Sequence, residues 1–479
     1  MQQRVDRDRR QAAGLLLRTH ERTGAEVTRS DEVVNEASRD WWPLAMIWAL
    51  DDRVAARASV VVRPDAVGQV GEILRACNDA SVPVTAAAGR SGVCGASVPV
   101  FGGVLLDLTN LSGIVDVDAT SMLVDVLPGT FGDVFEDQLR AEHGLTSGHW
   151  PQSIALSTVG GWVACRGAGQ LSTRYGKIED IVQGLDVVLA DGTTITTGGA
   201  PRAAVGPDLD QLFIGSEGTL GVIVGARLRV HPSPAAEGRA AHAFDSFTGA
   251  LDAMRRIVQR GATPAVLRLY DAIEADRSYD TGDANLLLVL DEGDAHIVDA
   301  TMRVVAEECA AATPIDVALV EQWLGHRNDV SALESLVQRG FVVDTMEISG
   351  SWRALPEIYE RTTEAMRAVE HTLAASAHQS HSYTDGGCLY FTFAGRPPED
   401  EREQYYRAMW DAGQSAVLAA GGALSHHHGV GLNRARFVAG ALGASFDVLV
   451  RVKRALDPNG ILNPGKLGLP SPFGDLAWP

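Results

Sequence analysis

Short apolar runs alternate with amphipathic stretches along the chain from residue 58 onward. The β-branched run ASVVVRP, residues 58–64, predicts a strand, and residues 65–82, whose apolar positions recur three and four apart, predict a helix. Residues 184–199 form another strand-and-turn unit, in which the pair Asp191-Gly192 predicts a hairpin. The Pro-rich stretch HPSPAAEG, residues 231–238, predicts a domain boundary.

A second region with the same alternation follows this boundary. Residues 247–261 and 296–312 have helical periodicity, whereas 264–271, 284–293 and 386–395 are short apolar runs typical of strands. Helices and mixed sheets in two domains are therefore predicted, which is an α+β architecture. A chain of 479 residues is also too long for one ordinary core.

Charge narrows the range of partners. The formal net charge is -20 at pH 7, and the sequence pI is about 5.0. A nucleic-acid partner is not expected, because a phosphate backbone requires a basic face. The charge also argues against a strongly anionic substrate, although a local basic pocket would override the global field.

The cysteines and the apolar runs indicate the cellular compartment and whether the chain crosses a membrane. Five cysteines are scattered without a C-x-x-C pair, which favours a reducing cytoplasm over a disulfide framework. Residues 1–24 are charged and predict a surface helix. The run WWPLAMIWAL, residues 41–50, has half the roughly 20 residues that a membrane span needs. We therefore expect a buried or lid segment there, and no membrane span.

A glycine-rich turn follows the strand predicted at residues 83–87. It carries Gly89, Gly92 and Gly95, and such turns let successive backbone N–H groups converge on a pyrophosphate. The turn has neither the Walker nor the Rossmann spacing, so alone it is as consistent with a plain turn. Three further Gly/Ser/Thr-rich segments, at 127–130, 153–164 and 213–223, favour a large flat ligand that bears a diphosphate.

The ordered motifs SGHWPQSIALSTVGGWVACRGAG, YGKIEDIV, GPDLDQLFIGSEGTLGVI, GGALSHHHGVG and DPNGILNPGK cover much of residues 58–467. In these motifs the chain resembles the vanillyl-alcohol-oxidase (PCMH) type of FAD-binding flavoprotein. Within that family it is most similar to the alkylglycerone-phosphate synthases and their bacterial relatives. The resemblance implies a helical extension at 1–55 and a two-subdomain FAD-binding domain at 56–232. It also implies a cap domain for the substrate at 233–430 and a returning segment at 431–479.

The resemblance also implies the cofactor and its contacts. The cofactor is FAD, bound non-covalently because the loop lacks the histidine that some relatives use for attachment. The implied contacts are Ala88, Gly89, Arg90, Ser91, Gly92, Val93, Pro128, Gly129, Thr130, Ser153, Ser157, Thr158, Gly160, Gly161, Glu217, Gly218, Leu220, Gly221 and Ile223.

Three consecutive histidines, His426, His427 and His428, form the chemical centre of the sequence. If the segment is extended, His426 and His428 face one way and His427 the other. Histidine suits proton transfer near neutral pH. The resemblance places the triplet and Tyr390 around the flavin as acid–base groups, with His149 and Arg268 in the substrate pocket.

His378 and His381 form a second histidine cluster, and histidine clusters are also typical of metal sites. In the related D-lactate and 2-hydroxyglutarate dehydrogenases a glutamate and two histidines hold a metal. The matching positions here are His427, Tyr383 and Tyr390, and neutral phenols do not make a hard-metal site. No metal is therefore expected.

The substrate of the synthases is in doubt for this chain. Their substrate-binding arginine corresponds to Leu333, which cannot pair with an acid group, and no sequence pattern shows Arg327 taking its place. An FAD-dependent oxidase or dehydrogenase acting on a small or specialised-pathway substrate is therefore favoured. An ether-forming transferase that uses flavin without net redox is the alternative, and whether the chain forms a homodimer is left open.

Overall fold

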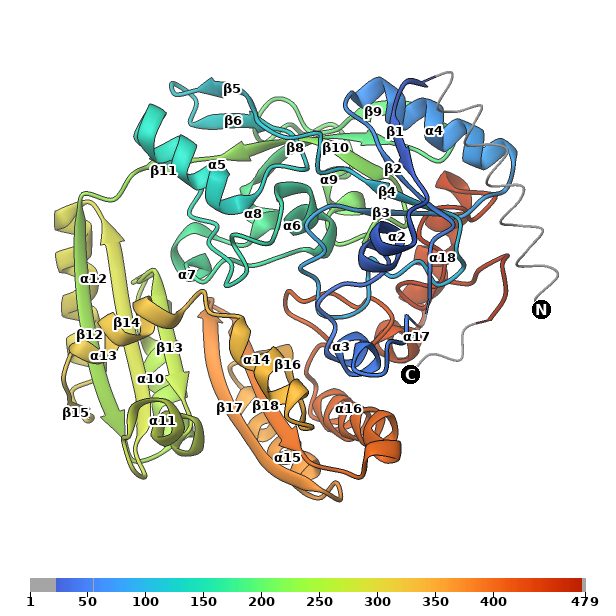
Figure 1. Cartoon of the computed structure of the whole chain (residues 1–479). Helices are drawn as coiled ribbons and strands as arrows, with labels where there is room; N and C mark the ends of the chain where they lie inside the picture. Colours follow the sequence, from blue (N-terminus) through green and yellow to red (C-terminus); the bar gives the residue numbers. More distant parts are fainter. Residues whose placement is uncertain (1–22, 55, 476–479) are drawn as a thin grey trace.

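The computed structural model describes residues 23–54 and 56–475, and for residues 331–334 the backbone alone. The expected helix at residues 1–24 lies almost wholly outside the described residues. Figure 1 shows two sheets and their helices in the upper part of the molecule and one large sheet in the lower part. The mixed helix and sheet content confirms the predicted α+β class.

The first upper sheet has the order β1-β2-β4-β3. Its strands are β1 (Glu26–Thr28), β2 (Val60–Arg63), β3 (Val84–Ala87) and β4 (Val104–Asp107). Strands β2 and β3 both run parallel to β4, and helix α4 (Val67–Asp79) connects β2 to β3. The strand and the helix predicted at residues 58–82 are thus confirmed, and the glycine-rich turn leaves the sheet at the end of β3.

The second upper sheet has the order β5-β6-β10-β8-β9. Its strands are β5 (Ile114–Asp118), β6 (Leu123–Val126), β8 (Val182–Val188), β9 (Thr194–Thr196) and β10 (Val222–Arg229). The hairpin predicted at Asp191-Gly192 is confirmed, because β8 and β9 pair antiparallel around it and Gly192 has a φ of 80°. Helices α5 (Gly132–Gln138), α6 (Val159–Cys165), α7 (Ser172–Tyr175), α8 (Ile178–Ile181) and α9 (Asp210–Phe213) accompany this sheet.

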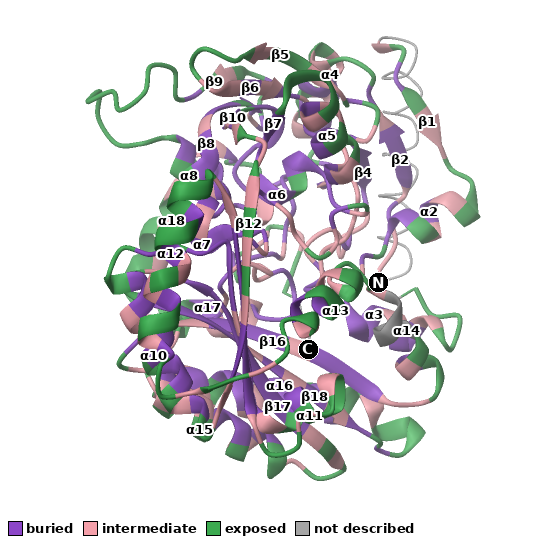
Figure 2. Cartoon of the chain, turned by 90° about the vertical axis from the view of Figure 1, so that its left-hand side faces the viewer, coloured by how far each residue is buried: buried purple, intermediate pink, exposed green. Residues whose placement is uncertain are grey.

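The lower sheet, called the cap sheet below, has the order β15-β12-β14-β13-β17-β18-β16. Its strands are β12 (Ala236–Phe244), β13 (Val266–Tyr270), β14 (Asn285–Gly293), β15 (Thr313–Pro314), β16 (Val342–Ser351), β17 (Thr372–Ser382) and β18 (Gly386–Gly395). Its helices are α10 (Phe247–Gln259), α11 (Ala272–Tyr279), α12 (Ala295–Glu308), α13 (Ala318–His326), α14 (Ser331–Gln338), α15 (Leu355–Arg367) and α16 (Arg402–Ala419). Figure 2 shows the strands of this sheet as largely buried. A short ladder, β7 (Leu145–Thr146) with β11 (His231–Pro232), precedes it.

The early apolar run forms helix α3 (Pro43–Ala49), preceded by helix α2 (Asp31–Ala37). Trp42, at the N-terminal end of α3, is fully buried, and its indole N–H donates to the Tyr406 hydroxyl at 2.9 Å. The expectation of a buried segment is thereby confirmed. No helix within residues 23–54 and 56–475 has the length and apolar character to cross a membrane.

The last part of the chain returns to the upper sheets. After α16 come helices α17 (Ala435–Leu442) and α18 (Ser445–Leu456), drawn in red beside the upper sheets in Figure 1. Leu462 then forms a β-bridge with Val84 of β3. The histidine triplet therefore lies on the stretch of chain that passes from the cap helix α16 back to the upper sheets.

Candidate active site

The glycine-rich turn after β3 presents unused backbone donors. Among the described residues, none of the backbone N–H groups from Gly89 to Val93 donates a hydrogen bond. A Cβ at Gly89 would lie 2.1 Å from the carbonyl oxygen of Leu156, so only glycine allows this approach of the two loops. Five free donors on one turn fit the requirement of a pyrophosphate.

The predicted cofactor segments at 128–130 and 153–161 meet beside this turn. The backbone N–H of Gly160 donates to the Pro128 carbonyl at 2.8 Å, and that of Val159 to the Thr130 carbonyl at 3.0 Å. Three side-chain hydroxyls of these segments already form hydrogen bonds within the protein. Thr130 bonds Gly113 and Leu127, Thr158 caps helix α6, and Ser157 accepts from the indole of Trp162.

The segment from Glu217 to Ile223 joins the same region. The Glu217 N–H donates to the Ala164 carbonyl at 2.8 Å, and Asn463 links the Glu217 carbonyl to that of Ala96. Gly218 lies next to open space, since a Cβ there would meet only Ala86, at 3.8 Å. Leu220 and Ile223 instead pack in the core beneath the second sheet, so a ligand would meet their backbone rather than their side chains.

The predicted cofactor segments converge in space although their ends, Ala88 and Ile223, are 135 positions apart in the chain. Unpaired backbone donors lie at one end, and the orphaned ring nitrogens of His149 lie near the other segments. The His149 ring is buried and stacks against Trp162 at 4.6 Å between centroids. These unsatisfied polar groups fit a flat ligand with a diphosphate, such as FAD.

The histidine triplet is held by one carboxylate. Glu347 of β16 is fully buried, and it accepts hydrogen bonds from the backbone N–H groups of His426, His427 and His428. The segment is thus a turn wrapped around Glu347 and is not extended, so the alternation of an extended strand does not apply to it. The rings of neighbouring histidines contact each other instead, with centroids 4.6 and 5.0 Å apart.

Two further donors bind the Glu347 carboxylate. The Ser425 hydroxyl donates to Glu347 at 2.6 Å, and the buried guanidinium of Arg434 donates to it at 2.9 Å. Burial acts to raise the pKa of Glu347, but Arg434 and the surrounding donors hold it below its usual value. The carboxylate is therefore ionised and fixes the backbone of the triplet.

The rings of the turn belong to a chain of hydrogen bonds, called the relay below. Its members, in order, are Tyr390, His427, His426, Tyr383, Ser172 and His381. The successive links measure 2.6, 2.8, 3.0, 3.2 and 2.7 Å. Each link needs one proton, and with neutral rings every link is satisfied when all the protons point from Tyr390 toward His381, or all of them the opposite way.

Electrostatics favours those neutral rings. Burial lowers the pKa values of His426, His427 and His381 well below their usual range, and that of His428 to about 4. Burial also raises the pKa of Tyr390 well above its usual range. At neutral pH the site therefore offers neutral imidazoles, which accept protons, next to a protonated phenol.

Arg268 and His378 form a second layer beneath Tyr390. The Arg268 guanidinium, on β13, bonds the Tyr270 hydroxyl at 2.6 Å and His378 Nε2 at 2.8 Å. The His378 ring donates from Nδ1 to Glu274 and stacks on Tyr390 at 4.5 Å between centroids. Arg268 and Tyr390, predicted from separate motifs, are thus joined through one histidine.

One group of side chains in this region has the composition of a metal site. Ligand atoms of Glu347, Cys388, His426 and His427 lie within 4.8 Å of one another. The Glu347 oxygens already accept five hydrogen bonds, and burial holds the pKa of the Cys388 thiol well above its usual range. Because a metal needs free lone pairs and a thiolate, these residues fit one poorly. The absence of a metal stays a prediction.

Sequence reasoning did not identify Glu347, Ser172, Lys177 or Cys165 as members of the site. Lys177 Nζ donates to the His426 carbonyl at 2.6 Å, and the Cys165 thiol donates to the His427 carbonyl at 3.0 Å. A glutamate inside the apolar strand 342–348 was the one signal available, because a charge buried in a strand requires partners. The side chain of Leu333 lies outside the described part of α14.

The chain is similar to two known domain families and to several characterised or named proteins. Residues 58–198 match the FAD binding domain, and residues 233–467 match the C-terminal domain of FAD linked oxidases. The FAD-linked oxidoreductase YgcU of Escherichia coli strain K12 is 32% identical over 431 residues, which is 85% of this chain and 88% of YgcU. The alkyldihydroxyacetonephosphate synthase of Dictyostelium discoideum is 28% identical over 446 residues, covering 85% of this chain and 73% of the synthase.

The fold is also similar to that of solved structures. A crystal structure of p-cresol methylhydroxylase with bound substrate matches with a TM-score of 0.77 at 17% identity, covering 99% of both chains. Identity this low supports a shared architecture and no shared substrate. The two-part flavoprotein fold predicted from the sequence motifs is the fold of that enzyme.

Proposed function

The chain belongs to the FAD-linked oxidase family and takes FAD as its cofactor, and from this premise we propose that it is an FAD-dependent oxidoreductase with Tyr390 and the histidine triplet as its acid–base groups. Bound FAD supplies an acceptor for the hydride of a small alcohol, hydroxy acid or amine. The substrate must lose a proton at the same time, so the chain must accept one. The 2.6 Å hydrogen bond between Tyr390 and His427 carries this proposal.

The relay gives that proton a path. The Tyr390 oxygen takes the substrate proton while its own proton moves to His427 Nε2. The Nδ1 proton of His427 passes to His426, and the Nε2 proton of His426 passes to Tyr383. The hydroxyl proton of Tyr383 passes to Ser172, and that of Ser172 passes to His381 Nδ1, which becomes the protonated imidazole. The positive charge therefore ends on His381, whose ring centroid lies 6.3 Å from that of Tyr390.

Substitution of Tyr390 tests the proposal. With FAD-loaded enzyme and a panel of alcohols, hydroxy acids and amines, a substrate bleaches the flavin under anaerobic conditions. Tyr390→Phe removes the first acceptor, so the rate of bleaching should fall about 10²-fold or more. Tyr405→Phe, which loses only a hydroxyl contact to Thr372 in the cap, is the matched control. Bleaching at an unchanged rate in Tyr390→Phe would refute the assignment.

A second candidate is the ether-forming transferase of the synthase type. It is supported by the similarity to the Dictyostelium synthase over 85% of the chain. Such an enzyme would exchange an acyl for an alkyl group and consume no electron acceptor. Leu333 weighs against it, since the acid-binding arginine of the synthases is missing there. Ether product formed without acceptor consumption would favour the transferase over the oxidoreductase.

A further inference from the structure

The segment between helices α2 and α3, residues 38–42, packs on the glycine-rich turn. Trp42 contacts the end of the turn, since a Cβ at Gly95 would lie 2.9 Å from its ring. Asp40 faces the middle of the turn, because a Cβ at Gly92 would lie 3.6 Å from its Oδ2. Residues 38–42 lie outside the matched FAD binding domain, which begins at residue 58. The N-terminal extension therefore adds a wall to the expected pyrophosphate site.

One oxygen of Asp40 is buried and has no partner. The residue is only 6% exposed, and its Oδ1 accepts from the backbone N–H of Trp42 at 3.2 Å. Its Oδ2 accepts and donates no hydrogen bond among the described residues. A buried polar atom without a partner requires an explanation, and a bound ligand can supply one. Because Oδ2 faces Gly92, the missing partner is expected at the glycine-rich turn.

Few charges oppose the effect of burial on Asp40. It makes no ion pair within the described part of the chain. The ammonium of Lys466 acts on it without pairing with it and donates instead to the Val98 carbonyl at 2.7 Å. On the turn itself, Arg90 is paired with Asp107 at 3.5 Å. Burial therefore raises the pKa of Asp40 to about 7, so the carboxyl keeps its proton at slightly acidic pH.

The protonated acid is the form that suits a pyrophosphate. Ionised phosphate oxygens accept hydrogen bonds, and a carboxylate can only accept them as well. Two anionic groups buried side by side would also repel each other. Since Oδ1 of Asp40 already accepts from Trp42, the proton belongs on Oδ2. It there faces the turn whose N–H groups at residues 89–93 are unused.

We propose that Asp40, as a neutral carboxylic acid, donates a hydrogen bond to a phosphate oxygen of FAD, so that FAD binding weakens as the pH rises above neutrality. The acid adds a sixth donor to the five N–H groups of the turn. It comes from the N-terminal extension, whereas the turn belongs to the matched domain. This role concerns how tightly the cofactor is held, whatever substrate the flavin oxidises.

Release of FAD from the holoenzyme on dilution, followed by flavin fluorescence, measures the dissociation constant at each pH. Only the protonated fraction of Asp40 donates, so the native constant should rise about tenfold or more from pH 6 to pH 8.5. In Asp40→Asn the amide oxygen still accepts from Trp42 and the NH₂ group donates at every pH. This rise should therefore disappear, while binding at pH 6 stays close to native. Asp40→Leu, neutral but without a donor, should bind FAD about tenfold more weakly at pH 6.

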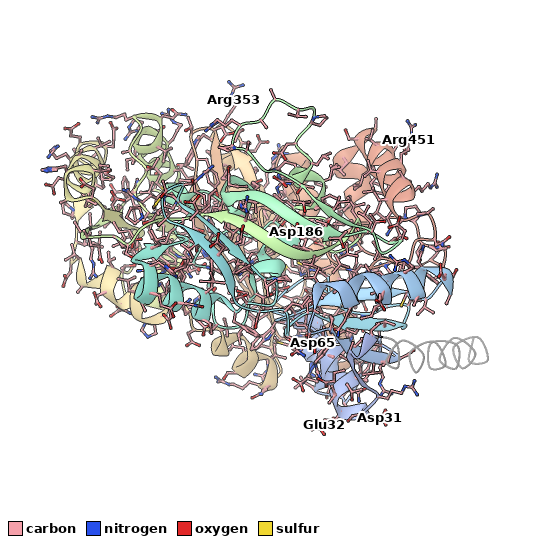
Figure 3. The ribbon with its side chains drawn as sticks, turned by 90° about the horizontal axis from the view of Figure 1, so that it is seen from above. Asp31, Glu32, Asp65, Asp186, Arg353 and Arg451 are labelled. Atoms are coloured by element: carbon pink, nitrogen blue, oxygen red, sulfur yellow. The ribbon has the colours of Figure 1, made fainter. Side chains whose placement is uncertain are left out.

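Glu32→Gln is the matched control and should keep the native pH profile. Glu32 is exposed on helix α2 and lies at the outer edge of the molecule in Figure 3. Lys466 and Glu217 are the other buried titratable groups of this region. A rise that persists in Asp40→Asn would belong to them and would overturn the proposal. A native constant that falls as the pH rises would also overturn it, because Asp40 would then act as a carboxylate acceptor. If Asp40→Leu does not fold, the comparison of the native enzyme with Asp40→Asn decides.

Discussion

Replacing Glu347 by glutamine should loosen the histidine turn more than the loss of one charge suggests. The carboxylate accepts from Ser425, Arg434 and the three histidine N–H groups, divided between its two oxygens. In Glu347→Gln an NH₂ group replaces one of the two carboxylate oxygens, so the N–H and O–H donors that this oxygen served would face another donor. Arg434, which is fully buried, would also lose its ion-pair partner.

The magnitude follows from these two losses. Removing one partner of a buried ion pair costs about 3–5 kcal/mol, because the other charge stays buried and unpaired. Donors left without an acceptor cost about 1–3 kcal/mol more. The apparent free energy of unfolding of Glu347→Gln should therefore fall by about 4–8 kcal/mol, and the flavin of the folded fraction should not be bleached by substrate.

Urea unfolding followed by tryptophan fluorescence measures the effect, and the same transition is compared in all variants because a two-domain protein need not unfold in one step. The double variant Glu347→Gln with Arg434→Met removes both charges, so its loss should be smaller than the sum of the single losses. Exposed Glu237, changed to glutamine, is the matched control and should shift stability by less than about 0.5 kcal/mol. Two results would refute the idea that Glu347 holds the histidine turn: a loss below about 1 kcal/mol in Glu347→Gln, or a loss in the double variant equal to the sum of the two single losses.

Two further substitutions test other parts of the site. Burial lowers the pKa of His149 to about 3. As the pH falls below about 6.5, the unfolded state therefore takes up a proton at this ring that the folded state does not. The free energy of unfolding should thus fall by roughly 2 kcal/mol between pH 8 and pH 5. His149→Phe should reduce the pH dependence of the urea midpoint by that amount, and an unchanged slope would contradict the neutral buried imidazole. Gly89→Ala should weaken FAD binding at least tenfold, because its Cβ would lie 2.1 Å from the Leu156 carbonyl oxygen. Gly68→Ala, on an open helix surface, should leave the FAD dissociation constant unchanged, and equal constants in the two variants would exclude the steric explanation.

Local patterns predicted the parts of the fold that depend on neighbouring residues. The hairpin at Asp191-Gly192 follows from a turn that two adjacent residues determine, and the strand and helix at 58–82 follow from apolar spacing. FAD and the two-part fold followed from ordered motifs and are confirmed by the family matches. The assigned roles of Tyr390 and the histidines stay predictions.

The conformation of the histidine turn could not be predicted in the same way. Glu347 and Ser425 are 78 positions apart, so no local pattern shows that one carboxylate gathers the triplet. The link from Tyr383 to Ser172 spans 211 positions and brings the cap sheet to α7. Such contacts arise only when separate sheets pack.

The buried contact between Trp42 and Tyr406 has a consequence for synthesis of the protein. The two residues are 364 positions apart. At about 5–20 residues per second, a ribosome needs roughly 18–73 s to reach the second after making the first. During that interval the tryptophans of the run at 41–50 lack their final packing partner. Helix α3 therefore completes its docking only after helix α16 has been made.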